Sequence, residues 1–177
     1  MGPSHYPGFC DGGHIDCENT GNAGWKYYGG FRMSPSLSGE IGYLNFERGA
    51  VTYAGPTAWQ QPRKTIRADG WNFNFAFRRE LTTNWSVVGR VGIARMKAEY
   101  YSHDGLGNST LVAQPKVRTP PYLGAALALD VSQMLGSFAS WPLDRFTVEM
   151  AVDTVRVQSG DYKRWARMWT IGGGLEF

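Results

Sequence analysis

Hydrophobic and polar residues alternate one by one along most of this chain, and residues 167–177 show the pattern most clearly. Counting back from the terminal Phe177, every second residue is Phe, Leu, Gly, Ile or Trp, and the residues between are Glu, Gly, Gly, Thr and Met. Period-two alternation predicts a β-strand with one apolar face. An apolar row with an aromatic residue at each end is expected on the lipid face of a transmembrane β-barrel.

Six other segments repeat this alternation. In the most regular one, four aromatic residues from Trp71 to Phe77 alternate with asparagine, alanine and arginine. The alternation slips near Val155 and Val157, which predicts a β-bulge or a rise of the chain above the membrane. Including 167–177, the seven predicted strands are 24–34, 37–47, 70–80, 85–94, 122–133, 146–158 and 167–177.

The polar rows favour a barrel over a soluble β-sandwich, which is the alternative. They are mostly small residues and asparagine with single charges of both signs, whereas a solvated face would carry more long charged side chains. Small residues with isolated charges suit the interior of a narrow barrel. Short connections (34–36, 81–84) also alternate with long ones (48–69, 101–121), as expected for short periplasmic turns and long external loops. Prolines in the long connections predict irregular structure there.

Composition excludes a transmembrane helix but says little for or against a transmembrane β-barrel. The mean hydropathy is −0.35 and the chain contains no run of 18 apolar residues. Half of each barrel strand is polar, so hydropathy hardly detects such strands. The 177 residues are enough for one domain. The start of the chain has no apolar segment of a secretory signal, so we expect that a signal was removed or that the chain is truncated.

The segment 24–44, GWKYYGGFRMSPSLSGEIGYL, resembles the second and third strands of OmpA-like outer-membrane β-barrels. In that family a GW-K-x-x-GG-aromatic strand, a short turn and an x-E-x-GY strand follow one another. The segments 89–92 and 147–149 fall where the family places further inward charges, and the chain ends like the family's closing strand. The resemblance covers residues 24–177. It implies an all-β fold, an antiparallel eight-stranded transmembrane barrel in the bacterial outer membrane.

Only seven strands are readable, because the family's first strand has no counterpart in the sequence. Residues 1–23 carry Pro3 and Pro7 without alternation, so we predict a loop-like external segment there and the barrel over 24–177. Single-chain bacterial barrels have an even number of strands. We therefore expect the first and last readable strands to pair directly, to leave a gap, or to accept a strand from elsewhere.

The only two cysteines are Cys10 and Cys17, and the six residues between them include Gly12 and Gly13. Such slack allows a small loop disulfide, as expected in an oxidising compartment. A zinc site is the alternative, but His14 is the sole further ligand nearby. OmpA-like proteins with a comparable cysteine pair in the first external loop support the disulfide.

Charges inside a narrow barrel must be paired, because an isolated buried charge is costly. We interpret these residues as a static plug of salt bridges, with a gate or narrow ion path as the alternative. The predicted lumen charges are Lys26, Arg32, Glu40, Arg78, Arg90, Asp130, Glu149, Asp153 and Glu176.

The outer surface has two predicted kinds of contact residue. The lipid-facing or girdle residues are Trp25, Tyr27, Phe31, Trp71, Phe73, Phe75, Trp169 and Phe177. Basic residues of the presumed loops would face lipopolysaccharide phosphates, to which Arg and Lys bind well. These are Arg63, Lys64, Arg67, Lys116, Arg118, Lys163 and Arg164.

The sequence thus indicates a structural protein of the outer membrane that supports the envelope and presents surface loops. A narrow pore or a carrier of a small hydrophobic ligand is the alternative. The net charge of +3 is too mild to indicate nucleic acid. No cofactor is expected and catalysis is not favoured, because His5, His14 and His103 lie in presumed loops without a Ser/His/acid grouping. The sequence leaves open whether a protein partner donates a strand or binds the loops.

Overall fold

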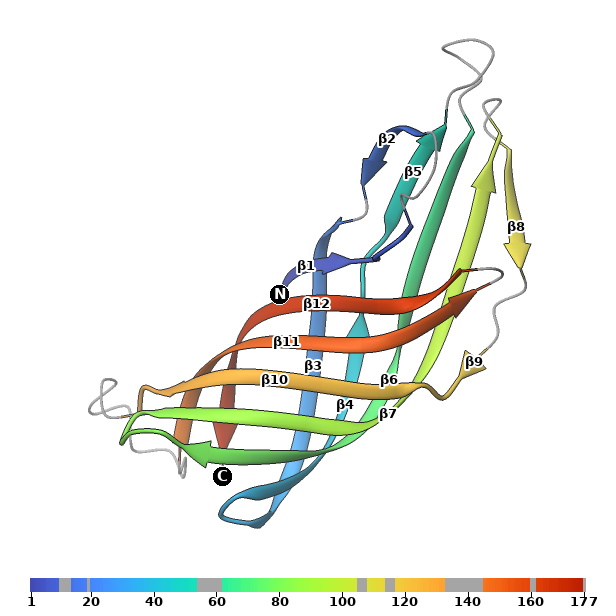
Figure 1. The fold of residues 1–177 in the computed structure, drawn as a ribbon. Coiled ribbons are helices and arrows are strands. Elements are labelled where there is room, and N and C mark those ends of the chain that lie inside the picture. The colour runs from blue at the N-terminus through green and yellow to red at the C-terminus, as the bar shows by residue number, and fades with distance from the viewer. Residues whose placement is uncertain are drawn as a thin grey trace.

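The computed structural model describes residues 1–9, 14–18, 20–53, 62–104, 108–113, 117–132, 145–159 and 162–176 (Figure 1). Its regular elements are all β-strands. No helix among these residues has the length and apolarity to cross a membrane. The strands are β1 (Gly2–His5), β2 (His14–Glu18), β3 (Thr20–Ser34), β4 (Leu37–Asn45), β5 (Gly49–Tyr53), β6 (Arg63–Glu80), β7 (Trp85–His103), β8 (Ser109–Ala113), β9 (Val117–Arg118), β10 (Pro121–Asp130), β11 (Arg145–Ser159) and β12 (Tyr162–Glu176).

Eight of these strands form a closed antiparallel ring in the order β1-β3-β4-β6-β7-β10-β11-β12, with β12 returning to β1. The expected eight-stranded, all-β barrel is therefore confirmed, and each of the seven predicted strands has a counterpart in it. Several strands are longer than predicted. β6 begins at Arg63 and β7 continues to His103, so both extend well beyond the alternating segments read from the sequence.

The prediction of a loop over residues 1–23 was wrong at three places. β1 pairs with β3 on one side and β12 on the other, β2 pairs with β5, and β3 already begins at Thr20. β1 has only 4 residues, fewer than the 9–11 that a membrane-spanning strand needs. Pro3 lacks an amide hydrogen and lies where the β1–β3 register shifts, between Gly2 and Ser4.

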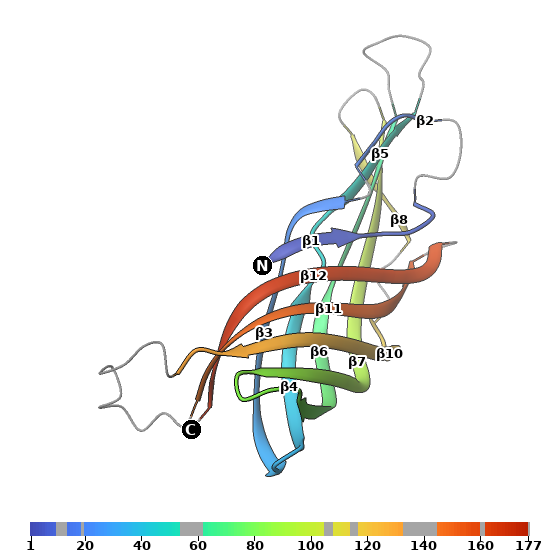
Figure 2. The same cartoon turned by 60° about the vertical axis from the view of Figure 1, so that its left-hand side comes forward.

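The barrel has two halves. We call the end with the short turns at 35–36 and 81–84 the turn half, and the opposite end, which continues into β2, β5 and β8, the loop half. The loop half rises beyond the ring as a sheet of β2, β5, β6, β7 and β8 (Figures 1 and 2). The prediction of irregular long connections was therefore wrong where β5, β8 and β9 lie.

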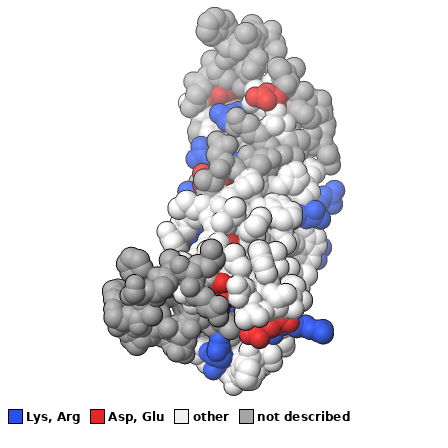
Figure 3. All heavy atoms as spheres, turned by 90° about the vertical axis from the view of Figure 1, so that its left-hand side faces the viewer, with Lys and Arg blue, Asp and Glu red and all other residues white. Residues whose placement is uncertain are grey.

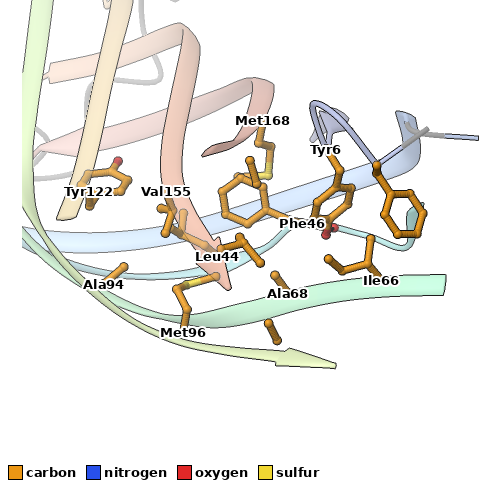
Figure 4. Close-up of a cluster of buried hydrophobic side chains, with 14 of the residues drawn as sticks. Tyr6, Leu44, Phe46, Ile66, Ala68, Ala94, Met96, Tyr122, Val155 and Met168 are labelled. Atoms are coloured by element: carbon orange, nitrogen blue, oxygen red, sulfur yellow. Dashed lines mark hydrogen bonds between the residues drawn. The ribbon is translucent and has the colours of Figure 1, made fainter. Parts of the chain in front are cut away.

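The interior of the loop half is a hydrophobic core rather than a polar lumen (Figure 4). Burying a large apolar side chain contributes about 1.5–3 kcal/mol, so this core anchors the strands above the polar lumen. Tyr6, which follows β1, donates its hydroxyl to the carbonyl oxygens of Phe46 and Glu47 and ties the N-terminal segment to it. The core includes Tyr6, Leu44, Phe46, Ile66, Ala68, Ala94, Met96, Tyr122, Val155, Val157, Ala166 and Met168.

This core explains the phase slip read near Val155 and Val157. The β11–β12 register is continuous from Arg145 to Ser159, so the predicted bulge is wrong. Both valines point inward and are buried, and Arg156 between them is exposed. The strand keeps its phase while the polarity of its two faces is exchanged, since the interior becomes apolar and the exterior becomes charged.

Candidate functional site

An ion-pair network centred on Arg90 fills the lumen of the turn half. Arg90 on β7 donates from Nε to Glu40 Oε2 on β4 at 2.9 Å and from Nη2 to Glu149 Oε2 on β11 at 3.0 Å. The Arg90 side chain is 2% exposed. The inward phase of three strands brings these residues together although they are far apart in the sequence. Charge-assisted hydrogen bonds of this length are stronger than neutral ones.

A second ion pair lies closer to the hydrophobic core. Lys26 Nζ on β3 is 2.7 Å from Asp153 Oδ2 on β11, and the side chains are 5% and 0% exposed. Tyr122 donates its hydroxyl to the other oxygen of Asp153. Both carboxylate oxygens are therefore engaged, which reduces the cost of burying this charge.

Tyr28 joins the two ion pairs. Lys26 Nζ lies 5.2 Å from the centre of its ring and Arg90 Cζ lies 4.9 Å from it. Both cations are within the distance at which an aromatic face attracts a positive charge. The ring thus bridges the cations of the two pairs.

Asparagines and a third cation extend the network. Asn74 on β6 donates to Glu40 at 2.8 Å, and Asn72 donates to Asn74. Arg78 Nη2 lies 3.9 Å from Glu149 Oε1. Three cations (Lys26, Arg78, Arg90) thus face three carboxylates (Glu40, Glu149, Asp153).

The other predicted lumen charges lie outside this group. Arg32 is exposed near the β3–β4 turn. Asp130 ends β10, where its carboxylate accepts a hydrogen bond from the Ser132 amide at 2.9 Å. The side chain of Glu176 lies outside the described residues. Sequence reasoning missed the parts played by Tyr28 and Tyr122, although the alternation had already placed Tyr28 on the polar face beside Lys26.

An apolar belt surrounds the turn half on its outer face. The outward side chains of β6 from Trp71 to Phe77 are each about half exposed, as are those of β7 from Val91 to Ile93. On β7 the apolar row runs from Trp85 to Ile93, nine residues, which reach about 23 Å at a rise of roughly 3.3 Å and a tilt of roughly 40°. That height matches the ~25 Å apolar band of outer-membrane barrels. The predicted surface residues Tyr27, Phe31, Trp71, Phe73, Phe75 and Trp169 are exposed, Trp25 is half-buried, and Phe177 lies outside the described residues.

An aromatic cluster marks the upper limit of the belt. The ring centres of Trp25 and Tyr27 are 4.9 Å apart, those of Trp25 and Tyr43 are 5.4 Å apart, and those of Tyr43 and Trp71 are 5.3 Å apart. Tyr43 donates its hydroxyl to Asp69 at 2.6 Å. Each ring thus lies at the level where the outer surface changes from apolar to charged, which suits residues with an apolar body and a polar tip.

A charged rim follows directly above the belt. Trp71 on β6 is followed on the same face by Asp69 and Arg67, Ile93 on β7 by Arg95, and Trp169 on β12 by Arg167. Figure 3 shows mostly uncharged surface across the middle of one face, with a few charged atoms in it and further charged residues above and below it. Lys97 Nζ lies 2.6 Å from Glu99 Oε1 in this region, and this hydrogen bond lowers the pKa of the Glu99 carboxyl.

The predicted basic loop residues lie mainly on strands, so their assignment to loops was wrong. Arg63, Lys64 and Arg67 are part of β6, Arg118 is part of β9, and Lys163 and Arg164 are part of β12. Lys64 Nζ lies 5.0 Å from the ring centre of Tyr53. Lys116 lies outside the described residues. The strand positions of the other six basic residues could not be predicted from alternation, because the strands continue beyond the alternating segments.

The cysteine prediction stays open. Cys17 lies in β2, opposite Val51 of β5, and packs partly buried against the hydrophobic core. Cys10 lies outside the described residues, so the disulfide stays a prediction. Among the residues that the structure describes, no group of three or more His, Cys, Asp or Glu side chains is placed to hold a metal ion.

A closed antiparallel ring with a paired polar lumen, an apolar belt and a charged rim defines the fold of a small outer-membrane β-barrel. A solved structure has the same fold: Ail, the attachment invasion locus protein of Yersinia pestis, with 12% sequence identity and a TM-score of 0.50 over 99% of this chain and 91% of that chain. At this identity the likeness shows the fold alone. No protein-family model matches the sequence, and no curated protein matches it.

Proposed function

We propose that this protein is an integral structural protein of the bacterial outer membrane that presents its loop half at the cell surface. The observation that carries the proposal is the exchange of polarity along single strands. On the outer face of β6, β7 and β12, the residues of the turn half are apolar up to Trp71, Ile93 and Trp169 respectively. The next residues on that face are charged. A soluble barrel has no reason to keep an exposed apolar band of bilayer height.

The interior supports a structural role better than a pore. Lys26 and Arg90 donate hydrogen bonds to lumen carboxylates, and Arg78 lies 3.9 Å from one. Above them, the buried side chains of Leu44, Tyr122 and Met168 fill the interior with apolar atoms. An ion would have to break the pairs and then enter an apolar core, and both steps are costly. These contacts support the proposed role in envelope integrity and surface presentation.

The charged rim is suited to the phosphates of lipopolysaccharide. Arg95, Arg156 and Arg167 are exposed on β7, β11 and β12, directly above the belt where lipid headgroups would lie. Guanidinium groups bind phosphate through parallel hydrogen bonds. The name of Ail concerns attachment and invasion by that protein. For this chain we propose surface presentation without assigning an adhesion target.

Fluorescence quenching by brominated lipids tests membrane insertion. Reconstituted protein should be quenched through Trp71 and Trp169, so Trp71→Phe and Trp169→Phe should each reduce the quenched signal. Trp165→Phe is the matched control, because Trp165 lies on β12 above Arg167 and opposite Arg156. Equal effects of all three substitutions, or a protein that stays monodisperse without detergent, would contradict the proposal.

Two further measurements separate the proposed role from its alternative. Planar bilayers containing the protein should show no stable single-channel steps, whereas a pore would. Phosphorylated lipid A should bind better than dephosphorylated lipid A, and alanine at Arg95, Arg156 and Arg167 together should remove that difference. Arg79→Ala is the control, since Arg79 is exposed at the opposite end of β6.

A further inference from the structure

The apolar belt is hollowed by a groove on the outer face of β7, β10, β11 and β12, which lie side by side in the wall (Figures 1 and 2). Its floor is at Ala125 of β10. Gly89 of β7 lies opposite Ala125, and a Cβ atom there would meet no atom within 4 Å. Residues 1–3 lie at the far end, and the floor and the two edges come from the four strands. The outward side chains along the groove are Val87, Leu127, Met150, Val152, Trp169 and Ile171.

The groove rises obliquely through the belt. At its β7 end it lies below Val91 and Ile93, and the first charge on that face is Arg95. At its β12 end Trp169 is followed on the same face directly by Arg167. The groove therefore begins in the middle of the belt and ends at the charged rim, as expected for a row of paired residues in a barrel whose strands are tilted.

Two guanidinium groups lie at the upper end of the groove. Arg167 of β12 is opposite Thr154 of β11, and Arg156 is the next residue after Thr154 on the same face. Both arginines are exposed, and diagonal neighbours on paired strands are within reach of long side chains. In the described part of the chain, the outward faces of β10, β11 and β12 carry no aspartate or glutamate. On β7, in contrast, Lys97 is 2.6 Å from Glu99. The rim beside the groove is thus suited to an anionic headgroup.

Packing explains why a lipid chain would prefer this place on the belt. Within a bilayer the whole belt is covered by hydrocarbon, so better packing, rather than the hydrophobic effect, must hold a chain at one position. On a smooth part of the wall a chain contacts protein on one side only. In the groove it would contact the floor at Ala125 and the larger side chains on both edges, such as Leu127 and Trp169. Dispersion contacts are individually weak and add up with their number.

We propose that the groove holds one acyl chain of a lipid A molecule whose phosphate is bound by Arg156 and Arg167. The proposal rests on the proposed function, in which the loop half faces the cell surface and the rim lies at the headgroups of the outer leaflet. Lipid A joins several acyl chains to a phosphorylated sugar. Its phosphate would lie at the two guanidinium groups, and one chain would follow the groove down from Trp169 towards Leu127.

Native mass spectrometry of the 177-residue protein in detergent micelles, titrated with lipid A, tests the site. Ala125→Leu fills the floor of the groove, and Gly89→Leu fills it independently from β7. Gly29→Leu is the matched control, because Gly29 is also exposed on the outer face and a Cβ atom there would meet no atom within 4 Å. Each filled variant should bind lipid A about tenfold more weakly, and the control should bind like the parent. Heat-modifiable gel migration verifies that each variant is folded.

Dephosphorylated lipid A separates the chain from the phosphate. Alanine at both Arg156 and Arg167 should weaken binding of the phosphorylated form by about tenfold or more and leave the dephosphorylated form unchanged. Ala125→Leu should weaken both forms by the same factor, since both carry the acyl chains.

Three results would overturn the proposal. The first is an Ala125→Leu variant that binds lipid A as well as the parent or the Gly29→Leu control does. The second is an arginine double variant that still prefers the phosphorylated form. The third is a dimer in sedimentation that Ala125→Leu abolishes, which would assign the groove to a second copy of the chain. Quenching of Trp71 on β6 by brominated lipids reports membrane insertion separately, so failure of the groove site is distinguishable from failure of the proposed function.

Discussion

Tyr122 donates its hydroxyl to Asp153 at the level where the polar lumen meets the hydrophobic core. Tyr122 is itself a fully buried member of that core, and Asp153 holds Lys26 at 2.7 Å. A single side chain therefore connects two interiors of opposite polarity. This contact links the polar lumen of the turn half to the hydrophobic core of the loop half.

We expect Tyr122→Phe to destabilise the barrel by about 1–3 kcal/mol, because the hydroxyl is lost and one buried oxygen of Asp153 is left without its donor. The aromatic ring and its packing are kept. Urea unfolding in detergent, followed by tryptophan fluorescence, measures the loss. Tyr27→Phe is the control, since Tyr27 is 64% exposed on the outer face and should change stability little. Equal losses in the two variants would argue against the contact.

Replacing Arg90 alone should cost more than replacing it together with one of its partners. Arg90→Met leaves Glu40 without its cation and leaves Glu149 with only Arg78, at 3.9 Å, and breaking a buried pair costs about 3–5 kcal/mol. Adding Glu149→Gln removes one of the two carboxylate charges that lost Arg90 and should recover part of that loss. A double-mutant cycle on unfolding free energies measures the coupling. Strictly additive losses would show that Arg90 and Glu149 act independently.

A charge in the middle of the belt should be far more costly than one above it. Phe75→Arg places a guanidinium on the outer face of β6, where Phe75 is 51% exposed, and a charge at the bilayer midplane costs roughly 2–4 kcal/mol. Gln158→Arg on β11 is the matched control above the belt. Folding yield into lipid vesicles, read from heat-modifiable gel migration, compares the two. Equal yields would place the bilayer elsewhere on the barrel.

Alternation alone predicted seven of the eight ring strands and the inward phase of Glu40, Arg90 and Glu149. It succeeded in the turn half because lipid outside and small residues inside impose opposite polarity on the two faces of each strand. It failed in the loop half because water outside and the hydrophobic core inside exchange that polarity, so Val155 and Val157 looked like a defect. β1 was missed because four residues that include Pro3 are too few to alternate.

The contacts of the lumen could be predicted only in part. The sequence indicated which charges face inward, but the register that brings Lys26 to Asp153 depends on barrel closure through β1 and on the pairing of seven other strands. Tyr122 lies at the boundary between the polar lumen and the hydrophobic core, so the alternation of polar and apolar residues did not predict its hydrogen bond to Asp153. The alternation placed Asp130 on the inward face, but Asp130 is the last residue of β10 and its carboxylate accepts a hydrogen bond from the Ser132 amide in the following turn.

Two glycines on β7 should respond in opposite ways to the same substitution. A Cβ atom at Gly92 would clash with the backbone oxygen of Phe73 on β6, whereas one at Gly89 would meet no atom within 4 Å. Since the obstacle at Gly92 is backbone in a paired strand, Gly92→Ala must push β6 and β7 apart. We expect a loss of about 1–3 kcal/mol, typical of overpacking.

Gly89→Ala is the matched control and should be neutral or slightly stabilising, because alanine reduces the conformational entropy of the unfolded chain by up to about 1 kcal/mol. Urea midpoints in the same detergent compare both variants with the parent protein. The expected order of midpoints is Gly89→Ala at or above the parent and Gly92→Ala below it. A reversed order would mean that β6 and β7 do not approach each other at Gly92, and the register that places Arg90 in the lumen would then have to be revised.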